Sequence, residues 1–272
     1  MEEALFGLKG RRVLVIGGGQ GMGEATALLL AGLGADVALL DVEIERAERV
    51  KSAVEGKGVS AYAVSGDVTD EASLVGAMAQ VEREFGPVDD LVTIIGMAAW
   101  SSLAEMTTAI WDQDHNRNLR YVFIAAREFA RSLIARDAPG SLVTIASVDG
   151  LRSAQNHGSY GAAKAGLVNL VKTMAQEWAP HGIRANCVAP GGIVTPRIPL
   201  GAPEKEAEGM ALVPMKRRGT TDEIAKAVAF FLSDMATYVT GQTLAVDGGY
   251  LAAGGFSLKL PTVAGQTLGM KG

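Results

Sequence analysis

The chain has 272 residues, of which 48% are hydrophobic and 20% are charged, and its formal net charge is −5. This composition is typical of a globular protein, and the acidic balance makes nucleic acid a poor partner. No apolar stretch reaches the ~20 residues that a membrane-spanning helix needs, and the first residues lack the apolar core of a secretory signal. We therefore expect a cytoplasmic protein with no membrane or nucleic-acid partner.

Cysteine and histidine are too sparse for a disulfide or a metal centre. Cys187 is the only cysteine and lies in an apolar run. The histidines His115, His157 and His181 are far apart and have no thiol or acidic companion at ligand spacing. The sequence therefore predicts no metal site.

The first predicted element is a strand that leads into a glycine turn and a helix. The apolar run 13–16 is followed by GGGQGMG and then by EATALLLAGLGA. Gly17 allows the tight turn, Gly21 lets the backbone approach a pyrophosphate, and Gly23 lets the helix pack closely on the strand. The positive helix N-terminus then faces the phosphates. The turn predicts a dinucleotide site that includes Gly17, Gly19, Gln20, Gly21, Met22 and Gly23.

The second predicted strand, 36–40, is followed by Asp41, eighteen residues after Gly23. A carboxylate at this place suits hydrogen bonding to the two hydroxyls of an adenosine ribose, and it repels the 2′-phosphate of NADP. Neither Gln20 nor Val42 offers a cation for that phosphate. NAD is therefore the expected cofactor, with Asp41 and Val42 at its adenosine. The alternative for Asp41 is a solvated turn carboxylate.

Five further apolar runs alternate with helical stretches along the chain. They lie at 59–64, 90–94, 141–146, 183–189 and 243–246. Such alternation predicts an α/β fold, a single-domain Rossmann fold whose doubly wound, seven-stranded parallel sheet carries helices on both faces. Ligands of such a sheet lie at the carboxyl ends of the strands, where Gly96 and Pro190 fall.

A group of residues that suits proton transfer lies around the fifth strand. Ser147 follows this strand, and Tyr160 and Lys164 stand four residues apart in a run with helical spacing, so both side chains should share one helix face. A neighbouring ammonium lowers the pKa of a tyrosine, which is ~10 in water. Ser147 can then hydrogen-bond a substrate oxygen while Tyr160 exchanges a proton with it. The three residues predict hydride transfer at a carbonyl carbon, whereas Tyr160 and Lys164 alone would also suit an amphipathic pair.

Two segments near the C-terminus depart from the alternation. Residues 192–215 hold four prolines around a short helical piece. They are interpreted as a substrate lid, with a passive surface excursion as the alternative. Residues 251–272 form a C-terminal extension that packs on the protein, reaches the site of a neighbouring subunit or remains a glycine-rich tail. Residues 1–250 are expected to form the single cofactor-binding and catalytic domain.

With these motifs in place, the chain resembles the short-chain dehydrogenase/reductase family in its compact form, from about Lys9 to Tyr250. The resemblance implies a catalytic tetrad of Asn118, Ser147, Tyr160 and Lys164, in which Asn118 anchors a proton-relay water. It also implies a homotetramer in which helices within 107–136 and 157–180 pack against their copies. The cofactor contacts that it implies are Asp67 and Val68 at the adenine, Pro190, Gly191 and Thr195 at the nicotinamide, and Gly96, Tyr160, Lys164 and Ile193.

The chain departs from the family pattern at two places. Where the family commonly has Asn-Asn-Ala-Gly after the fourth strand, this chain has Thr93-Ile94-Ile95-Gly96, which puts the local architecture in question more than the chemistry. Asp149 stands where a small residue is usual. An exposed loop acid is the preferred interpretation, and a substrate-recognising carboxylate is the alternative. His157 either faces the substrate cleft or lies in water at a helix entry.

The expected function is that of an NAD-dependent oxidoreductase acting on a hydrophobic secondary alcohol or ketone of cyclic, steroid-like or aryl type. The alternatives are an NADP-linked 3-ketoacyl-carrier reductase and a non-catalytic NAD-sensing regulator. An extended epimerase or dehydratase is disfavoured by the glycine spacing and by the lack of a long C-terminal substrate domain. The candidate substrate residues are Trp100, Asp149, Leu151, Asn156 and Gly192, with Ala98, Ala99 and Arg152 as further wall candidates.

Overall fold

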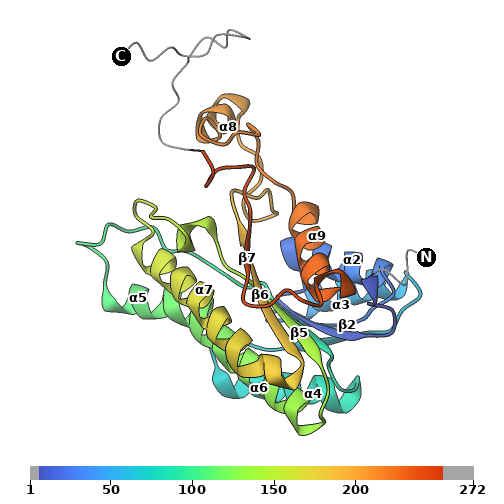
Figure 1. Cartoon of the computed structure of the whole chain (residues 1–272). Helices are drawn as coiled ribbons and strands as arrows, with labels where there is room; N and C mark the ends of the chain where they lie inside the picture. Colours follow the sequence, from blue (N-terminus) through green and yellow to red (C-terminus); the bar gives the residue numbers. More distant parts are fainter. Residues whose placement is uncertain (1–5, 254–272) are drawn as a thin grey trace, which may run out of the picture.

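Seven parallel strands form one sheet in the order β3-β2-β1-β4-β5-β6-β7 (Figure 1). The structure is a computed structural model that describes residues 6–253. The predicted single-domain, doubly wound fold is confirmed, and the strand order reverses between β1 and β4. The strands are β1 (Arg12–Ile16), β2 (Asp36–Asp41), β3 (Ala61–Ser65), β4 (Asp90–Thr93), β5 (Gly140–Ile145), β6 (Ile183–Pro190) and β7 (Thr243–Val246).

Helices cover both faces of this sheet. One face carries α2 (Gly21–Gly32), α3 (Ile44–Glu55) and α9 (Thr221–Leu232), and the other carries α4 (Glu71–Glu84), α6 (Tyr121–Ala135) and α7 (Gly158–Trp178). Helix α5 (Thr108–His115) continues through a π-helical turn, Asn116–Arg120, into α6. The short helix α8 (Pro203–Gly209) lies between β6 and α9 and stands apart from the sheet in Figure 1.

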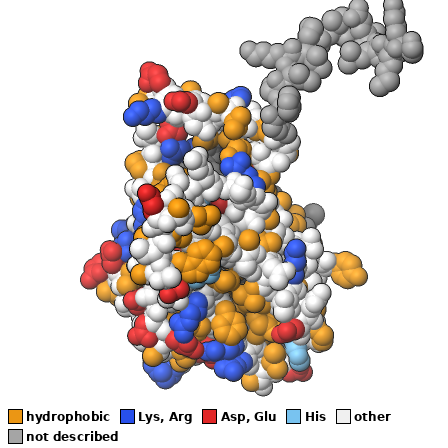
Figure 2. Space-filling model, turned by 90° about the vertical axis from the view of Figure 1, so that its left-hand side faces the viewer, with side chains coloured by type: hydrophobic (Ala, Val, Ile, Leu, Met, Phe, Trp, Pro, Cys, Tyr) orange, Lys and Arg blue, Asp and Glu red, His pale blue; other side chains and the backbone are white. Residues whose placement is uncertain are grey.

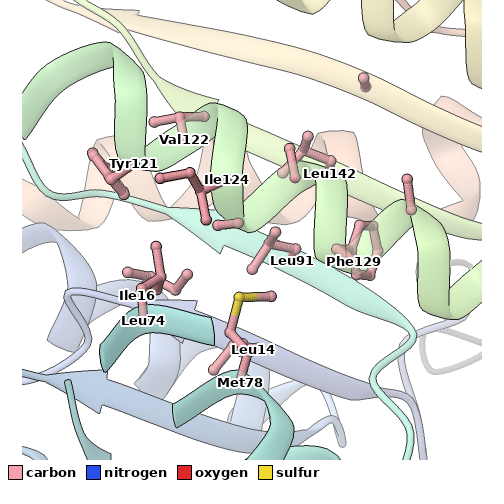
Figure 3. Packing of buried hydrophobic residues seen from close by; sticks show 14 of the residues in the cluster. Leu14, Ile16, Leu74, Met78, Leu91, Tyr121, Val122, Ile124, Phe129 and Leu142 are labelled. Carbon is pink, nitrogen blue, oxygen red and sulfur yellow. The ribbon is translucent and has the colours of Figure 1, made fainter. Parts of the chain in front are cut away.

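The central strands are held by apolar layers on both faces. Leu91 of β4 and Leu142 of β5 are wholly buried, and Figure 3 shows them among side chains from α4 and α6. Full burial of such a side chain contributes about 1.5–3 kcal/mol, so β4 and β5 are firmly placed. The loops that leave their carboxyl ends therefore start from fixed positions.

Charged side chains tie the amino ends of the strands together. Arg11 donates from Nε and Nη2 to both oxygens of Asp90, each at 2.6 Å, and Asp90 is completely buried. On β2, Asp36 accepts a hydrogen bond from the Ser60 backbone N–H at 2.8 Å. At this edge of the sheet each of these carboxylates has its partner within the protein.

The strand boundaries differ from the sequence-based ones by one or two residues. The largest difference is at β3, which begins at Ala61 instead of residue 59. No helix within residues 6–253 is both long and apolar enough to cross a membrane. The expectation for the C-terminal extension falls mainly on residues 254–272, which lie outside the described residues.

Candidate active site

Ser147, Tyr160 and Lys164 meet at the carboxyl end of β5. Ser147 caps a 3-10 turn, Val148–Gly150, because its Oγ accepts from the Asp149 backbone N–H at 3.1 Å. Tyr160 lies in the first turn of α7 and Lys164 in the next, with Nζ 5.7 Å from the centroid of the tyrosine ring. The predicted helical pair is thus confirmed as one cluster with the serine.

Lys164 is almost wholly buried, and its Nζ donates to the carbonyl of Ile145 at 2.7 Å. Gly96, three residues after the end of β4, leaves room for it. A Cβ on Gly96 would lie 3.2 Å from Lys164 Nζ and 3.0 Å from Asn118 Oδ1. A larger residue at position 96 would therefore push against both side chains.

Burial is the largest cause of the pKa shifts of Tyr160 and Lys164, the two residues on α7. It raises the pKa of Tyr160 to about 12, hydrogen bonding to Ser147 acts in the opposite direction, and Asp149 raises the pKa further. Burial also lowers the pKa of Lys164 to about 8. The expected lowering of the Tyr160 pKa by Lys164 is therefore wrong for the protein as it stands. Its ammonium is directed at Ile145, and burial outweighs any attraction.

Asn118 joins this cluster from the π-helical turn. Its Nδ2 donates to the carbonyls of Met97 at 2.7 Å and of Asp114 at 2.8 Å, and its Oδ1 accepts from the Met97 N–H at 3.2 Å. The Tyr121 hydroxyl donates to the carbonyl of Ile95 at 2.7 Å. These bonds hold the segment whose sequence departs from the family pattern.

The glycine turn has the geometry that a pyrophosphate site requires. Gly17 and Gly21 have φ values of +90° and +60°, which favour glycine. A Cβ on Gly23 would lie 1.9 Å from the carbonyl oxygen of Gly17, so only glycine fits this contact of helix and turn. No side chain caps the N-terminus of α2, and its positive end remains suited to an anion.

Asp41 lies buried at the end of β2 beside this turn. Its carboxylate accepts from the backbone N–H groups of Gly19 and Glu43, both at 3.1 Å. It also pairs with Nη2 of Arg46 at 3.1 Å. The alternative interpretation of Asp41 as a solvated turn carboxylate is wrong, because the side chain is buried. The expectation that no cation lies nearby is also wrong, because Arg46, in the first turn of α3, reaches the carboxylate from outside positions 20 and 42.

The segment after β6 reaches the same turn. Thr195 Cβ and Pro196 Cδ would lie 3.9 and 3.7 Å from a Cβ on Gly21. With its amide oxygen turned toward them, Gln20 accepts from Arg197 Nε at 3.0 Å and from Arg46 Nη1 at 3.3 Å. The other expected cofactor residues lie along the carboxyl edge of the sheet. Among them Val68 and Ile193 are buried, Met22 packs against the core, and Val42 and Asp67 are exposed. Pro190 ends β6 and Gly191 follows it.

Comparisons with known proteins agree with this geometry. Residues 17–251 match the family model described as Enoyl-(Acyl carrier protein) reductase. The chain is 37% identical to levodione reductase of Leifsonia aquatica over 254 residues, covering 89% of this chain and 95% of that protein. It is 39% identical to cis-4-hydroxycyclohexanecarboxylate dehydrogenase of Sinomonas cyclohexanicum over 243 residues, covering 89% of this chain and 97% of that protein.

Solved structures show the same likeness. A levodione reductase crystal structure matches with a TM-score of 0.86 at 35% identity, covering 91% of this chain and 100% of that chain. A short-chain type dehydrogenase/reductase from Mycobacterium marinum matches with a TM-score of 0.85 at 31% identity, covering 90% and 97%. The chain belongs to the short-chain dehydrogenase/reductase family. Its relatives are named dehydrogenases and reductases, which supports an oxidoreductase acting on CH–OH groups with a nicotinamide cofactor.

The substrate side of this dehydrogenase/reductase site holds a polar pair. The side chain of Asp149 is only 15% exposed, and Oδ2 lies 2.8 Å from Nδ1 of His157, itself 11% exposed. The preferred interpretation of Asp149 as an exposed loop acid is therefore wrong, and His157 does not lie in water. Trp100 covers the imidazole, with ring centroids 3.6 Å apart.

The remaining substrate candidates are not all together. Asn156, at φ +62°, accepts through its carbonyl from the Ser101 N–H at 3.0 Å and so joins the Trp100 loop to α7. Leu151 lines a different groove, with residues of α7 and of the loop before β7. Gly192 lies near Arg218 and Met210. Within residues 6–253 no cluster of His, Cys, Asp and Glu has the makings of a metal site.

Asp114 is a buried acid near the site that was not predicted from the sequence. Its carboxylate accepts from the hydroxyl of Ser159 and from the Ala99 N–H, the latter at 3.4 Å. It thereby links α5, the first turn of α7 and the loop after β4. A single acid within a helical stretch carries no spacing signal, so only the fold shows that Asp114 supports the position of Tyr160.

Proposed function

We propose that the protein is an NAD-dependent dehydrogenase/reductase that transfers hydride between NAD and a hydrophobic secondary alcohol or ketone of cyclic, steroid-like or aryl type. The observation that carries the proposal is the cluster of Ser147, Tyr160 and Lys164 at the carboxyl end of β5, beside Gly96 and Asn118. A non-catalytic sensor would have no use for a buried lysine one helical turn from a half-buried tyrosine.

Each residue of the cluster has a distinct task in the proposed reaction. Bound NAD supplies the hydride acceptor. Tyr160 takes the alcohol proton as the general base, and the hydroxyl of Ser147 steadies the substrate oxygen. The ammonium of Lys164 lowers the pKa of Tyr160 and favours the phenolate when it lies close enough to the phenol oxygen. Asn118 holds the backbone at Met97, next to Gly96 and Lys164, where a water would carry the proton onward.

The preference for NAD rests on Asp41. Its buried carboxylate at the end of β2 suits the ribose hydroxyls, and it disfavours a 2′-phosphate. Arg46 is the observation that favours the alternative, an NADP-linked ketoacyl-type reductase, because a guanidinium can pair with phosphate. Since Arg46 is already engaged by the Asp41 carboxylate, we infer that NAD is preferred.

Residues 192–215 are proposed as the lid of this site. Thr195 and Pro196 already approach the glycine turn. The ion pair of Arg218 with Glu206, at 2.5 Å, links α8 to the segment that precedes α9. Closure of this segment over the substrate would exclude water from the path of the hydride.

A homotetramer is the proposed assembly. The side of the molecule that carries α5 and α7 shows hydrophobic side chains gathered near the middle of its face (Figure 2). On α6, Phe123 is 45% exposed and Ile134 is 39% exposed. Light scattering should give four times the chain mass of 28.3 kDa, and a monomer would contradict this assembly.

The proposed function is tested by a turnover screen. The purified protein is incubated with NAD or NADP and a panel of cyclic, steroid, aryl and short-chain secondary alcohols, and the absorbance of the reduced nicotinamide is followed. We expect turnover of one or more cyclic or aryl alcohols with NAD and slower turnover with NADP. Confirmed NAD binding, combined with silence across the panel and with the matching ketones and NADH, would contradict the proposal.

A further inference from the structure

His157 and Asp149 form a pair that the proposed mechanism does not use. His157 directly precedes α7, and its ring meets that of Tyr160 edge-on, with centroids 5.5 Å apart. Asp149 holds Nδ1 of the imidazole at 2.8 Å, and its own backbone N–H donates to Ser147 Oγ. The pair therefore contacts both residues that are proposed to handle the reacting oxygen.

The far nitrogen of this imidazole has no partner. An ionised carboxylate only accepts hydrogen bonds, so Nδ1–H donates to Asp149, and the tautomer that this bond selects has Nε2 as its acceptor. Nε2 is buried and makes no hydrogen bond to any described residue. Buried polar atoms without partners are uncommon and costly, and near an active site they point to a ligand group.

Trp100 lies over the same ring. Its indole is 73% exposed although it contacts the imidazole, so it can move aside with little loss of buried area. Such a movement would uncover Nε2. A ligand that takes its place would need an apolar frame and one hydrogen-bond donor.

We propose that His157 recognises a second hydroxyl group of the substrate, and that Asp149 is the positioning residue that holds the imidazole ready to accept it. The substrate class is then a secondary alcohol on a cyclic or aryl frame with another hydroxyl one or two carbons from the reacting carbon. This inference rests on the proposed function, because it specifies the substrate of the same site.

Paired substrates test the inference. The probes are 1-phenylethane-1,2-diol against 1-phenylethanol, and cyclohexane-1,2-diol against cyclohexanol, each with NAD. We expect kcat/KM of the wild type to favour the diol by about 10- to 100-fold, mainly through KM, because the plain alcohol leaves Nε2 without a partner.

Variants of His157 and Asp149 test whether this pair causes the preference for the diol over the plain alcohol. His157→Phe keeps an aromatic ring against Trp100 and removes Nε2, so the ratio of kcat/KM for the diol to kcat/KM for the plain alcohol should fall to about one. Asp149→Ala should lower the ratio, and His157→Gln should restore part of it through its amide oxygen. His115→Phe is the matched control, since His115 also stacks on a tryptophan, Trp111, with ring centroids 4.4 Å apart. NAD binding shows that each variant is folded.

The outcomes separate the two proposals. Equal turnover of diol and plain alcohol by the wild type, or an unchanged ratio in His157→Phe, would overturn the role of His157 and leave the proposed function intact. If no probe reduces NAD and no matching ketone oxidises NADH, the proposed function and the role of His157 fail together.

Discussion

Two buried charged residues at opposite edges of the sheet, Asp90 and Lys164, have different kinds of partner. At the amino ends, Asp90 is completely buried but accepts two hydrogen bonds from Arg11. At the carboxyl ends, Lys164 is equally buried but has only the neutral carbonyl of Ile145 as a partner, and Nε2 of His157 has none within the described residues. The Arg11–Asp90 pair stabilises the fold, whereas Lys164 and His157 keep hydrogen-bonding groups that a cofactor and a substrate can use.

The pKa values express this difference. Burial raises the pKa of Asp90 to about 6, but the attraction of Arg11 opposes the shift, so the pair is ionised at pH 7. Burial lowers the pKa of Lys164 to about 8 with no carboxylate to oppose it. Burial therefore costs stability at both edges, and for Asp90 the charge of Arg11 offsets part of that cost.

The largest expected effect is the loss of turnover in Tyr160→Phe. Removal of the phenol should lower kcat by about 10²- to 10⁴-fold, because the general base is gone while the ring remains. NAD binding, followed by titration, should be unchanged. Tyr238→Phe, at a fully exposed tyrosine, serves as the control. Normal turnover by Tyr160→Phe would contradict the assigned site.

At the amino edge, Arg11→Met should destabilise the protein without affecting catalysis of the remaining folded enzyme. It leaves the buried carboxylate of Asp90 without its partner, which costs about 3–5 kcal/mol. Denaturant unfolding measures the change. Arg83→Met removes an exposed pair with Glu84 and should cost no more than about 1 kcal/mol. Equal effects of the two substitutions would show that Asp90 does not depend on Arg11.

Lys164→Met should act in the opposite direction on stability. The pKa lowered from 10.5 to about 8 corresponds to roughly 3 kcal/mol of unfavourable burial at pH 7. About 1 kcal/mol is lost with the bond to Ile145, so a net gain of about 2 kcal/mol is expected, together with loss of turnover.

The pH dependence provides a second test of Lys164. Between pH 8 and 10.5 the unfolded chain binds the proton that the folded lysine has lost, so the contribution of Lys164 to stability should rise with pH across this range. The raised pKa of Tyr160 acts in the opposite direction, so the contribution of Lys164 is measured as the difference in unfolding free energy between the wild type and Lys164→Met. Lys172→Met, which alters an exposed lysine of the same helix, should keep the wild-type profile. A difference between the wild type and Lys164→Met that does not change with pH would refute the unpaired burial of Lys164.

The smallest expected effect is a shift of cofactor preference in Asp41→Ser. The change weakens the hold on the ribose hydroxyls and frees Arg46 for a 2′-phosphate, so the ratio of NAD to NADP affinity should fall about 10- to 100-fold. Asp36→Ser, at the amino end of the same strand, should leave the ratio unchanged. An unchanged ratio in Asp41→Ser would show that Asp41 does not select the cofactor.

The sequence predicted the fold and the shared helix face of Tyr160 and Lys164 because both follow from local rules. Alternation of apolar runs with helical stretches predicts the parallel sheet, and the four-residue spacing of Tyr160 and Lys164 predicts a shared helix face. Asp41 and the glycine turn lie at fixed distances from strand ends. Such features depend on neighbours along the chain, and the structure places them where the sequence indicates.

The remaining features depend on contacts between distant segments. The pairing of Asp149 with His157 needs the turn after β5 to meet the start of α7, and Arg46 reaches Asp41 only after α3 has folded back on β2. The direction of the Tyr160 pKa shift depends on how deeply the phenol is buried. No residue pattern predicts these contacts or the depth of burial. The exposure expected for Asp149 was therefore wrong, and Arg46 was not predicted to lie near Asp41.

The most direct test of the central claim is to follow hydride itself with secondary alcohols that carry deuterium on the carbinol carbon. After incubation with the protein and NAD, the reduced nicotinamide is isolated and its label located by mass spectrometry and NMR. The account predicts deuterium on the nicotinamide ring with the wild type and labelling that is about 10²- to 10⁴-fold slower with Tyr160→Phe. Reduced cofactor without label, or NAD bound but never reduced by any alcohol of the panel, would contradict it.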